Sequence, residues 1–122
     1  MGVGYFLDTY AIYEIIAGNP RYEDYLSKDS NTSILNIAEI YYRLLREFGE
    51  SFADDKTLPL FSVALSIKPL TIKHAMLFRL KNKDKRLSYA DCIGYILAKE
   101  NGLKFLTGDK EFKGLENVEF VK

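Results

Sequence analysis

Four carboxylates stand at positions in this sequence from which they could act together on a phosphodiester. Asp8 and Asp109 each follow a short apolar run, and Glu39 and Asp91 each lie near the start of an expected helix. Carboxylate oxygens are ligands that Mg²⁺ and Mn²⁺ prefer. Such ions can activate water and stabilise the leaving oxygen of a phosphodiester. We therefore predict that these four acids are both the catalytic residues and the ligands of Mg²⁺ or Mn²⁺.

Each of the four acids also has a purely structural explanation, because each stands where a helix begins or the chain turns. The positions are Asp8 after a strand, Glu39 three residues after Asn36, Asp91 three residues after Ser88, and Asp109 after Gly108. An N-cap, two capping boxes and a Gly-Asp turn would account for them one at a time. The argument for a shared site is their coincidence at the ends of expected strands and the starts of expected helices.

Strand and helix signals alternate along the chain, which is typical of a parallel sheet with right-handed crossovers. We expect strands at residues 3–7, 32–35, 66–68, 103–106 and 118–121. We expect helices at residues 9–17, 19–26, 36–48, 58–65, 71–81 and 88–100, with a polar helix-to-helix turn at residues 49–58. The length of 122 residues fits a single domain spanning residues 1–122. In such sheets, ligands bind at the C-terminal ends of the strands.

The composition excludes several kinds of site. The chain has one cysteine, Cys92, and one histidine, His74, so it can form neither an internal disulfide nor a zinc site built from several Cys and His ligands. No apolar run is long enough to span a membrane, and the first residues lack the features of a secretory leader, so we expect a cytoplasmic protein.

Any nucleic-acid contact needs a local basic patch, because 17 basic residues balance 17 acidic ones. The candidate patch is Arg79, Lys81, Lys83, Lys85 and Arg86. Its basic side chains could contact phosphates. They could equally be a solvated helix end and loop.

The ordered motifs resemble those of PIN domains, and in particular the VapC-like toxins. The matching segments are Phe6-Leu7-Asp8-Thr9, Asn36-Ile37-Ala38-Glu39-Ile40, Ser88-Tyr89-Ala90-Asp91-Cys92 and Leu106-Thr107-Gly108-Asp109. The resemblance implies a three-layer α/β/α sandwich with a central, mainly parallel sheet. It also implies a Mg²⁺- or Mn²⁺-dependent endoribonuclease, with Thr107 supporting the four acids. By family alone, it implies a homodimer and a small antitoxin protein as partner.

Two other functions compete with the ribonuclease. The first is a catalytically weak PIN-like module that binds RNA or a protein. The second is a phosphatase or phospho-receiver on the same kind of sheet edge. Haloacid-dehalogenase-type phosphatases carry an Asp two residues after the nucleophilic Asp, and this chain has Tyr10 there. That departure disfavours the phosphatase.

Overall fold

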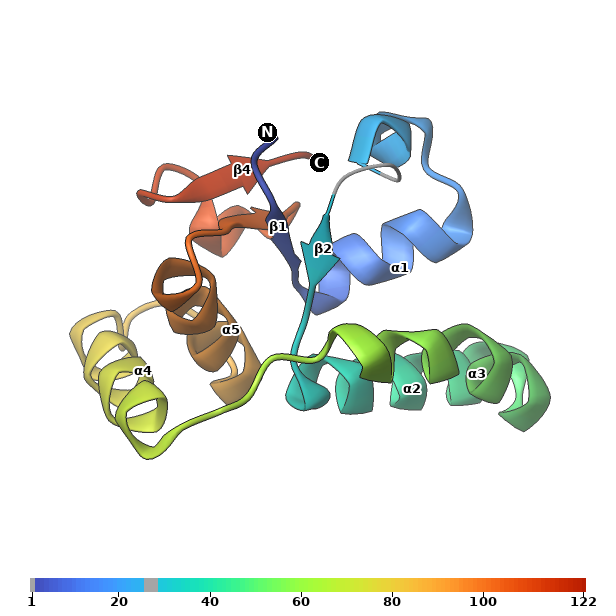
Figure 1. Ribbon diagram of the computed structural model, residues 1–122, viewed down its shortest axis with the longest axis horizontal. Coiled ribbons are helices and arrows are strands. Elements are labelled where there is room, and N and C mark those ends of the chain that lie inside the picture. Colours follow the sequence, from blue (N-terminus) through green and yellow to red (C-terminus); the bar gives the residue numbers. More distant parts are fainter. Residues whose placement is uncertain (1, 26–28) are drawn as a thin grey trace.

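A four-stranded parallel sheet lies at the centre of the computed structural model, which describes residues 2–25 and 29–122 (Figure 1). The strands are β1 (Tyr5–Leu7), β2 (Ser30–Asn31), β3 (Lys104–Thr107) and β4 (Val118–Phe120), and their order across the sheet is β2-β1-β3-β4. The α-helices are α1 (Thr9–Ala17), α2 (Ile34–Phe48), α3 (Glu50–Thr57), α4 (Pro69–Lys81) and α5 (Tyr89–Glu100). Three short 3-10 helices complete the described elements, namely η1 (Pro20–Tyr25), η2 (Leu58–Val63) and η3 (Lys110–Phe112).

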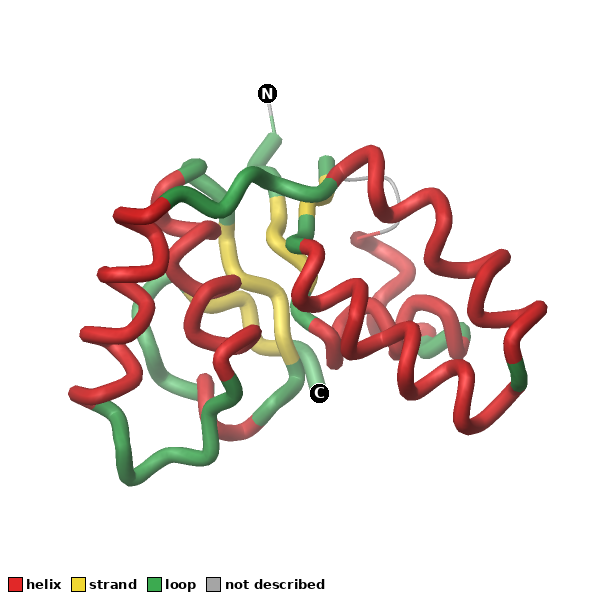
Figure 2. The backbone as a smooth tube through the Cα atoms, turned by 90° about the horizontal axis from the view of Figure 1, so that it is seen from below, coloured by secondary structure: helices red, strands yellow, loops and turns green. Residues whose placement is uncertain are grey.

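The side chains of the two central strands, β1 and β3, point alternately to the two faces of the sheet, and they divide the interior into two cores. In β1, Phe6 belongs to one buried cluster and Leu7 to the other, because neighbouring side chains of a strand point to opposite faces. In β3, Phe105 and Leu106 divide in the same way. Helices cover both faces, as the two groups of helices on either side of the sheet in Figure 2 show. The predicted three-layer α/β/α sandwich is therefore confirmed.

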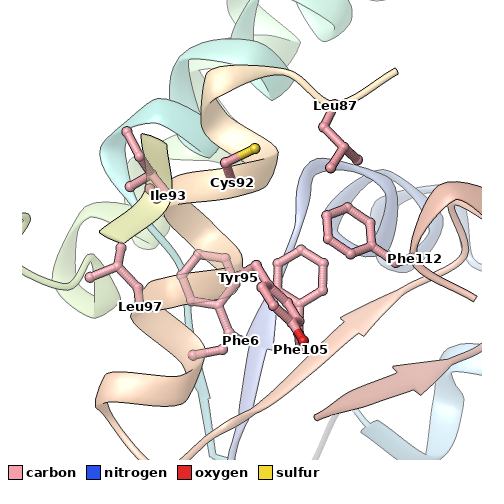
Figure 3. Close-up of a cluster of buried hydrophobic side chains, with 10 residues drawn as sticks. Phe6, Leu87, Cys92, Ile93, Tyr95, Leu97, Phe105 and Phe112 are labelled. Atoms are coloured by element: carbon pink, nitrogen blue, oxygen red, sulfur yellow. The ribbon is translucent and has the colours of Figure 1, made fainter. Parts of the chain in front are cut away.

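The core beneath α4 and α5 is largely aromatic (Figure 3). The rings of Phe6 and Phe105 stack with centroids 5.7 Å apart, and Tyr95 meets Phe105 edge to face. Helix α5 comes close to the sheet at Gly94, where an added Cβ would lie 2.7 Å from a ring carbon of Phe6. Cys92 is fully buried in this core. These contacts fix the start of α5, and hence Asp91, against the central strands.

The core on the opposite face lies beneath α1, α2 and α3. Ile12 of α1 and Ile40 and Leu44 of α2 pack in one cluster with Leu7 and Leu106 of the sheet. In α2, residues 37, 40 and 44 are buried at helical spacing, whereas Leu45 and Phe48, which continue the apolar stripe of this helix in the sequence, are exposed. This face therefore holds the first turns of α1 and α2 beside the ends of β1 and β3. None of the described helices has the length and apolarity needed to cross a bilayer.

Several predicted elements differ from those observed. The strand expected at residues 32–35 is only Ser30–Asn31, because Ser33 caps a helix that begins at Ile34. Within the turn expected at residues 49–58, residues 50–57 form helix α3, and no strand forms at residues 66–68. The helix expected at residues 58–65 is the 3-10 helix η2. The helix expected at residues 19–26 is the 3-10 helix η1, and residue 26 lies outside the described residues.

Candidate active site

Asp8 stands directly after β1 and caps the first turn of α1. Its carboxylate accepts a hydrogen bond from the backbone N–H of Ala11 at 2.8 Å, and the Thr107 hydroxyl also hydrogen-bonds to this carboxylate. The backbone N–H of Asp8 donates to the carbonyl of Leu106 at 3.3 Å, which ties the residue to the end of β3. Only 2% of Asp8 is exposed. The predicted N-cap is thus present at the edge where the sheet presents its strand ends.

Burial dominates the ionisation of Asp8. It raises the pKa of this carboxyl from 3.8 to about 8, although the hydrogen bonds from Thr107 and Ala11 act in the opposite direction. The negative charges of Asp91 and Asp109 raise the pKa further. A carboxyl in this setting keeps its proton near neutral pH until a nearby positive charge favours the ionised form.

Glu39 is held by a chain of hydrogen-bonded polar groups that the sequence did not reveal. Its Oε1 accepts a hydrogen bond from Thr9 Oγ1 at 2.6 Å, and Thr9 Oγ1 in turn accepts one from Asn36 Nδ2 at 3.2 Å. Ser33 Oγ donates to Asn36 Oδ1 at 2.7 Å. The capping box expected between Asn36 and Glu39 is therefore wrong, because Ser33 caps α2 and Glu39 lies beyond its first turn. Thr9 follows Asp8 directly, so this chain links two of the four acids.

Asp91 occupies the third position of α5 and completes the predicted capping box with Ser88. Its carboxylate accepts from the Ser88 N–H at 2.8 Å, and its own N–H donates to Ser88 Oγ at 3.0 Å. Burial raises the pKa of Asp91 to about 6, with the Ser88 bonds acting against it and the charges of Glu39 and Asp109 adding to it. Capping and participation in the acidic cluster are therefore compatible in this residue.

Asp109 follows β3 and caps the short helix η3. Its Oδ1 accepts from the N–H of Glu111 at 3.0 Å, and its own N–H donates to Thr107 Oγ1 at 3.0 Å. Thr107 is fully buried and hydrogen-bonds Asp8 as well. The Thr107 hydroxyl thus connects Asp8 to the backbone of Asp109.

The structure brings the four acids into one electrostatic cluster, because Asp91 senses Glu39 and Asp109 while Asp8 senses Asp91 and Asp109. Within the described ranges, no three His, Cys, Asp or Glu side chains are set closely enough to hold a metal ion as they stand. The donors are carboxylate and hydroxyl oxygens, which suit Mg²⁺ or Mn²⁺. A divalent ion would also offset the mutual repulsion that adds to the effect of burial on these pKa values. The donor chemistry therefore fits such an ion.

The residues of the predicted basic patch lie at the end of α4 and in the connection that follows it. Arg79 and Lys81 end α4, whereas Lys83, Lys85 and Arg86 lie in the connection to α5. Arg79, Lys83 and Lys85 line one pocket, and Lys81 lines a neighbouring pocket that shares Leu80 with the first. The RNA-contacting role of these residues stays a prediction.

The site contains residues that sequence reasoning missed. Thr9, Asn36 and Ser33 all support Glu39, and the only sequence signal for Thr9 was its place beside Asp8. Cys92 follows Asp91, and burial raises the pKa of its thiol to about 11. A thiol in this state is not a nucleophile near neutral pH. Chemistry in this region therefore falls to the oxygen groups.

Comparisons with known proteins agree with this fold. The family model described as PIN domain matches residues 5–118. A toxin-antitoxin complex from Klebsiella pneumoniae superposes with a TM-score of 0.76 at 18% identity, covering 94% of this chain and 95% of that one. VapC20 of Mycobacterium tuberculosis, a sarcin-ricin-loop-cleaving toxin, gives 0.76 at 19% identity and 96% coverage of both chains. DNA-bound VapBC from Salmonella typhimurium gives 0.74 at 16% identity and 98% coverage of both chains. No curated protein matches by sequence.

Proposed function

The chain belongs to the PIN-domain family, and from that premise we propose that it is a Mg²⁺- or Mn²⁺-dependent endoribonuclease that hydrolyses RNA phosphodiester bonds. The observation that carries the proposal is the electrostatic cluster of Asp8, Glu39, Asp91 and Asp109. Residues that only cap helices would not need to lie near one another. Two carboxyl groups with pKa values raised to about 8 and about 6 at the C-terminal edge of a parallel sheet support the proposal of a reactive site.

The four carboxylates would hold the ion, and Thr107 would keep Asp8 oriented. When bound, the ion would supply an activated water and a positive charge beside the phosphate. The protein groups do the positioning. Thr9 fixes one oxygen of Glu39 and leaves the other free of that bond, and Ser88 orients Asp91 in the same manner. Cations at the end of α4 and in the loop after it, among them Arg79 and Lys83, would contact the RNA backbone.

Cleavage of a structured RNA in the presence of Mn²⁺ tests the proposal. The wild type should cut the RNA, EDTA should stop it, and Asp8→Asn should be inactive. Asp55→Asn, on the exposed surface of α3, is the matched control and should cut as the wild type does. Equal, metal-insensitive cleavage by the wild type and Asp8→Asn would mean that a contaminating nuclease is responsible, and the proposal would fall.

One observation favours the alternative of a catalytically weak binding module. In the described part of the chain, the acids do not form a ready-made metal site. Calorimetry with Mn²⁺ separates the two functions, because a nuclease must bind the ion whereas a pure binding module need not. RNA binding without any heat of Mn²⁺ binding would establish the binding module instead.

We also propose that the protein is the cytoplasmic, homodimeric toxin of a toxin-antitoxin pair, held inactive by a small antitoxin. An apolar groove on α2 and η2 supports a protein partner. It is lined in part by Ile34, Tyr42, Leu45 and Phe61, all of them exposed. The product of a short reading frame next to this gene should inhibit cleavage, and Leu45→Asp should weaken that inhibition while leaving cleavage intact. An unimpaired inhibition of Leu45→Asp would remove the groove from the proposal.

A further inference from the structure

A second surface, at the start of the helix that carries Asp91, combines cations with an exposed aromatic ring. The pocket lies between the end of α4, the loop that follows it and the first residue of α5. Its volume is about 390 Å³, and its lining is Met76, Arg79, Leu80, Lys83, Lys85 and Tyr89. Three of these residues are basic and none is acidic. In a chain whose total charge is zero, this is a local concentration of positive charge.

Tyr89 is held in an open position. Its side chain is among the exposed large apolar groups, with 61% of the residue accessible. The guanidinium of Arg79 lies 4.6 Å from the ring centroid, and Arg79 Nε donates to the carbonyl of Leu87 at 3.2 Å. Arg79 is therefore anchored to the backbone and supports the ring through a cation–π contact. An aromatic ring held in this way keeps a surface free for stacking without the cost of ordering it first.

The chemistry of the pocket suits one unpaired nucleotide. Flexible lysine ammonium groups at Lys83 and Lys85 can neutralise phosphates, and the ring of Tyr89 can stack on a base. Met76 and Leu80 add apolar surface of the kind that a base buries. A base in a duplex is already stacked and shielded, so a pocket of this kind selects single strands and loops.

The pocket and the acidic cluster each include a residue from the first turn of α5. Tyr89 and Asp91 both belong to the first turn of α5, and a separation of two residues places them on different sides of the helix. We propose that this pocket binds a nucleotide of single-stranded RNA that flanks the cleaved bond, with its base stacked on Tyr89 and its phosphate near Lys83 and Lys85. The inference rests on the proposed ribonuclease function and assigns a substrate-binding residue to it.

The experiment measures binding of a short, fluorescently labelled single-stranded RNA by anisotropy, in EDTA so that no cleavage occurs. Tyr89→Ala should weaken binding about tenfold, and Tyr89→Phe should retain it, because stacking needs the ring and not the hydroxyl. Lys83→Ala should lower the slope of log K against log salt by about 0.7. Tyr89→Ala should leave that slope unchanged, since it removes no charge.

Tyr42 supplies a matched control. It is 63% exposed, and the guanidinium of Arg46 lies 5.4 Å from its ring centroid, but it lines the apolar groove on α2. Tyr42→Ala should bind RNA as the wild type does. RNA oligonucleotides that each lack one base should identify the stacked nucleotide. One of them should bind the wild type about tenfold more weakly than the intact RNA does, and Tyr89→Ala should bind that oligonucleotide and the intact RNA equally well.

Three results would overturn the proposal that this pocket binds a nucleotide. They are no binding of single-stranded RNA by the wild type, no loss of RNA affinity in Tyr89→Ala, or an equal loss of RNA affinity in Tyr42→Ala. A different result would overturn the ribonuclease proposal. If Tyr89-dependent binding is found and Mn²⁺ produces no cleavage, the pocket stands and the catalytic assignment falls.

Discussion

Replacing Asp8 with Asn should make the metal-free protein more stable, and the gain should grow with pH. Asn keeps the acceptor oxygen that caps α1, because Asn and Asp are equivalent N-caps. It removes a carboxyl whose pKa burial raises from 3.8 to about 8. Ionisation of this group therefore costs the folded state more than the unfolded state. The contribution of protonated Asp8 to the stability of the wild type is fully present below pH ~4 and is lost as the pH rises toward about 8.

The magnitude follows from the displacement of the pKa. Each unit between the unfolded and folded values corresponds to about 1.36 kcal/mol. From pH ~5 to pH ~8, the difference in unfolding free energy between Asp8→Asn and the wild type should widen by up to about 4 kcal/mol. For a domain of this size, that is a difference in Tm on the order of 15 °C. The full value is an upper limit, because water that enters the site as Asp8 ionises reduces the cost of burial.

Guanidinium unfolding in EDTA at several pH values measures this difference. The raised pKa of Asp91 changes the stability of both proteins in the same direction, so it largely cancels in the comparison. Asp55→Asn removes an exposed carboxylate from α3 and should show no such pH-dependent gain. A constant difference between Asp8→Asn and the wild type from pH ~5 to pH ~8 would refute the reasoning, because it would mean that Asp8 ionises normally in the folded protein.

Three other outcomes are expected. Mn²⁺ at about 100 times its Kd should stabilise the wild type by about 2.7 kcal/mol in thermal unfolding, and Asp8→Asn should gain much less; an equal gain in both would place the ion elsewhere. Thr9→Val, which removes the hydrogen bond to Glu39, should weaken Mn²⁺ binding at least tenfold in calorimetry, and Thr9→Ser should restore it; unchanged affinity in Thr9→Val would show that Glu39 needs no such support. Gly94→Ala should destabilise the fold by about 1–2 kcal/mol in denaturant unfolding despite the better helix propensity of Ala, because its Cβ would meet the Phe6 ring; a more stable variant would show that the ring moves freely.

The sequence predicted the fold well where periodicity was strong. The apolar spacing of α2 and the Ser88 capping box are local patterns, and the structure contains the capping box and the helix, with Ile37, Ile40 and Leu44 buried. Alternation of strands and helices was enough to predict the parallel sheet and its two covering layers. These features succeed because hydrophobic spacing and capping depend on neighbours a few residues apart.

The errors arose where short polar segments admit more than one structure. Asn31, Thr32 and Ser33 could continue a strand or begin a helix, and the choice follows from contacts with distant residues, such as the bond from Thr32 Oγ1 to the carbonyl of Leu7 at 2.8 Å. Helix α3 has little amphipathic pattern, and only Ala53 and Thr57 are buried in it, so its packing against α2 could not be inferred from spacing.

The candidate site divides in the same way. The four acids could be proposed because strand ends and helix starts converge in a parallel sheet. The bond between Thr9 and Glu39 spans 30 residues, and no local pattern announces it. The pocket around Tyr89 likewise depends on how α4 ends beside the start of α5.

The buried thiol of Cys92 is a built-in probe of local unfolding at the start of α5. An alkylating reagent needs an accessible thiolate, and Cys92 is sealed beneath α5 with a pKa of about 11. Labelling therefore requires that the start of α5 separate from the sheet. The labelling rate reports the free energy of this local unfolding. Since Asp91 precedes Cys92, a ligand that binds the Asp91 carboxylate should slow the labelling of Cys92. One sulfur atom thus records how firmly the helix that carries Asp91 is held in place.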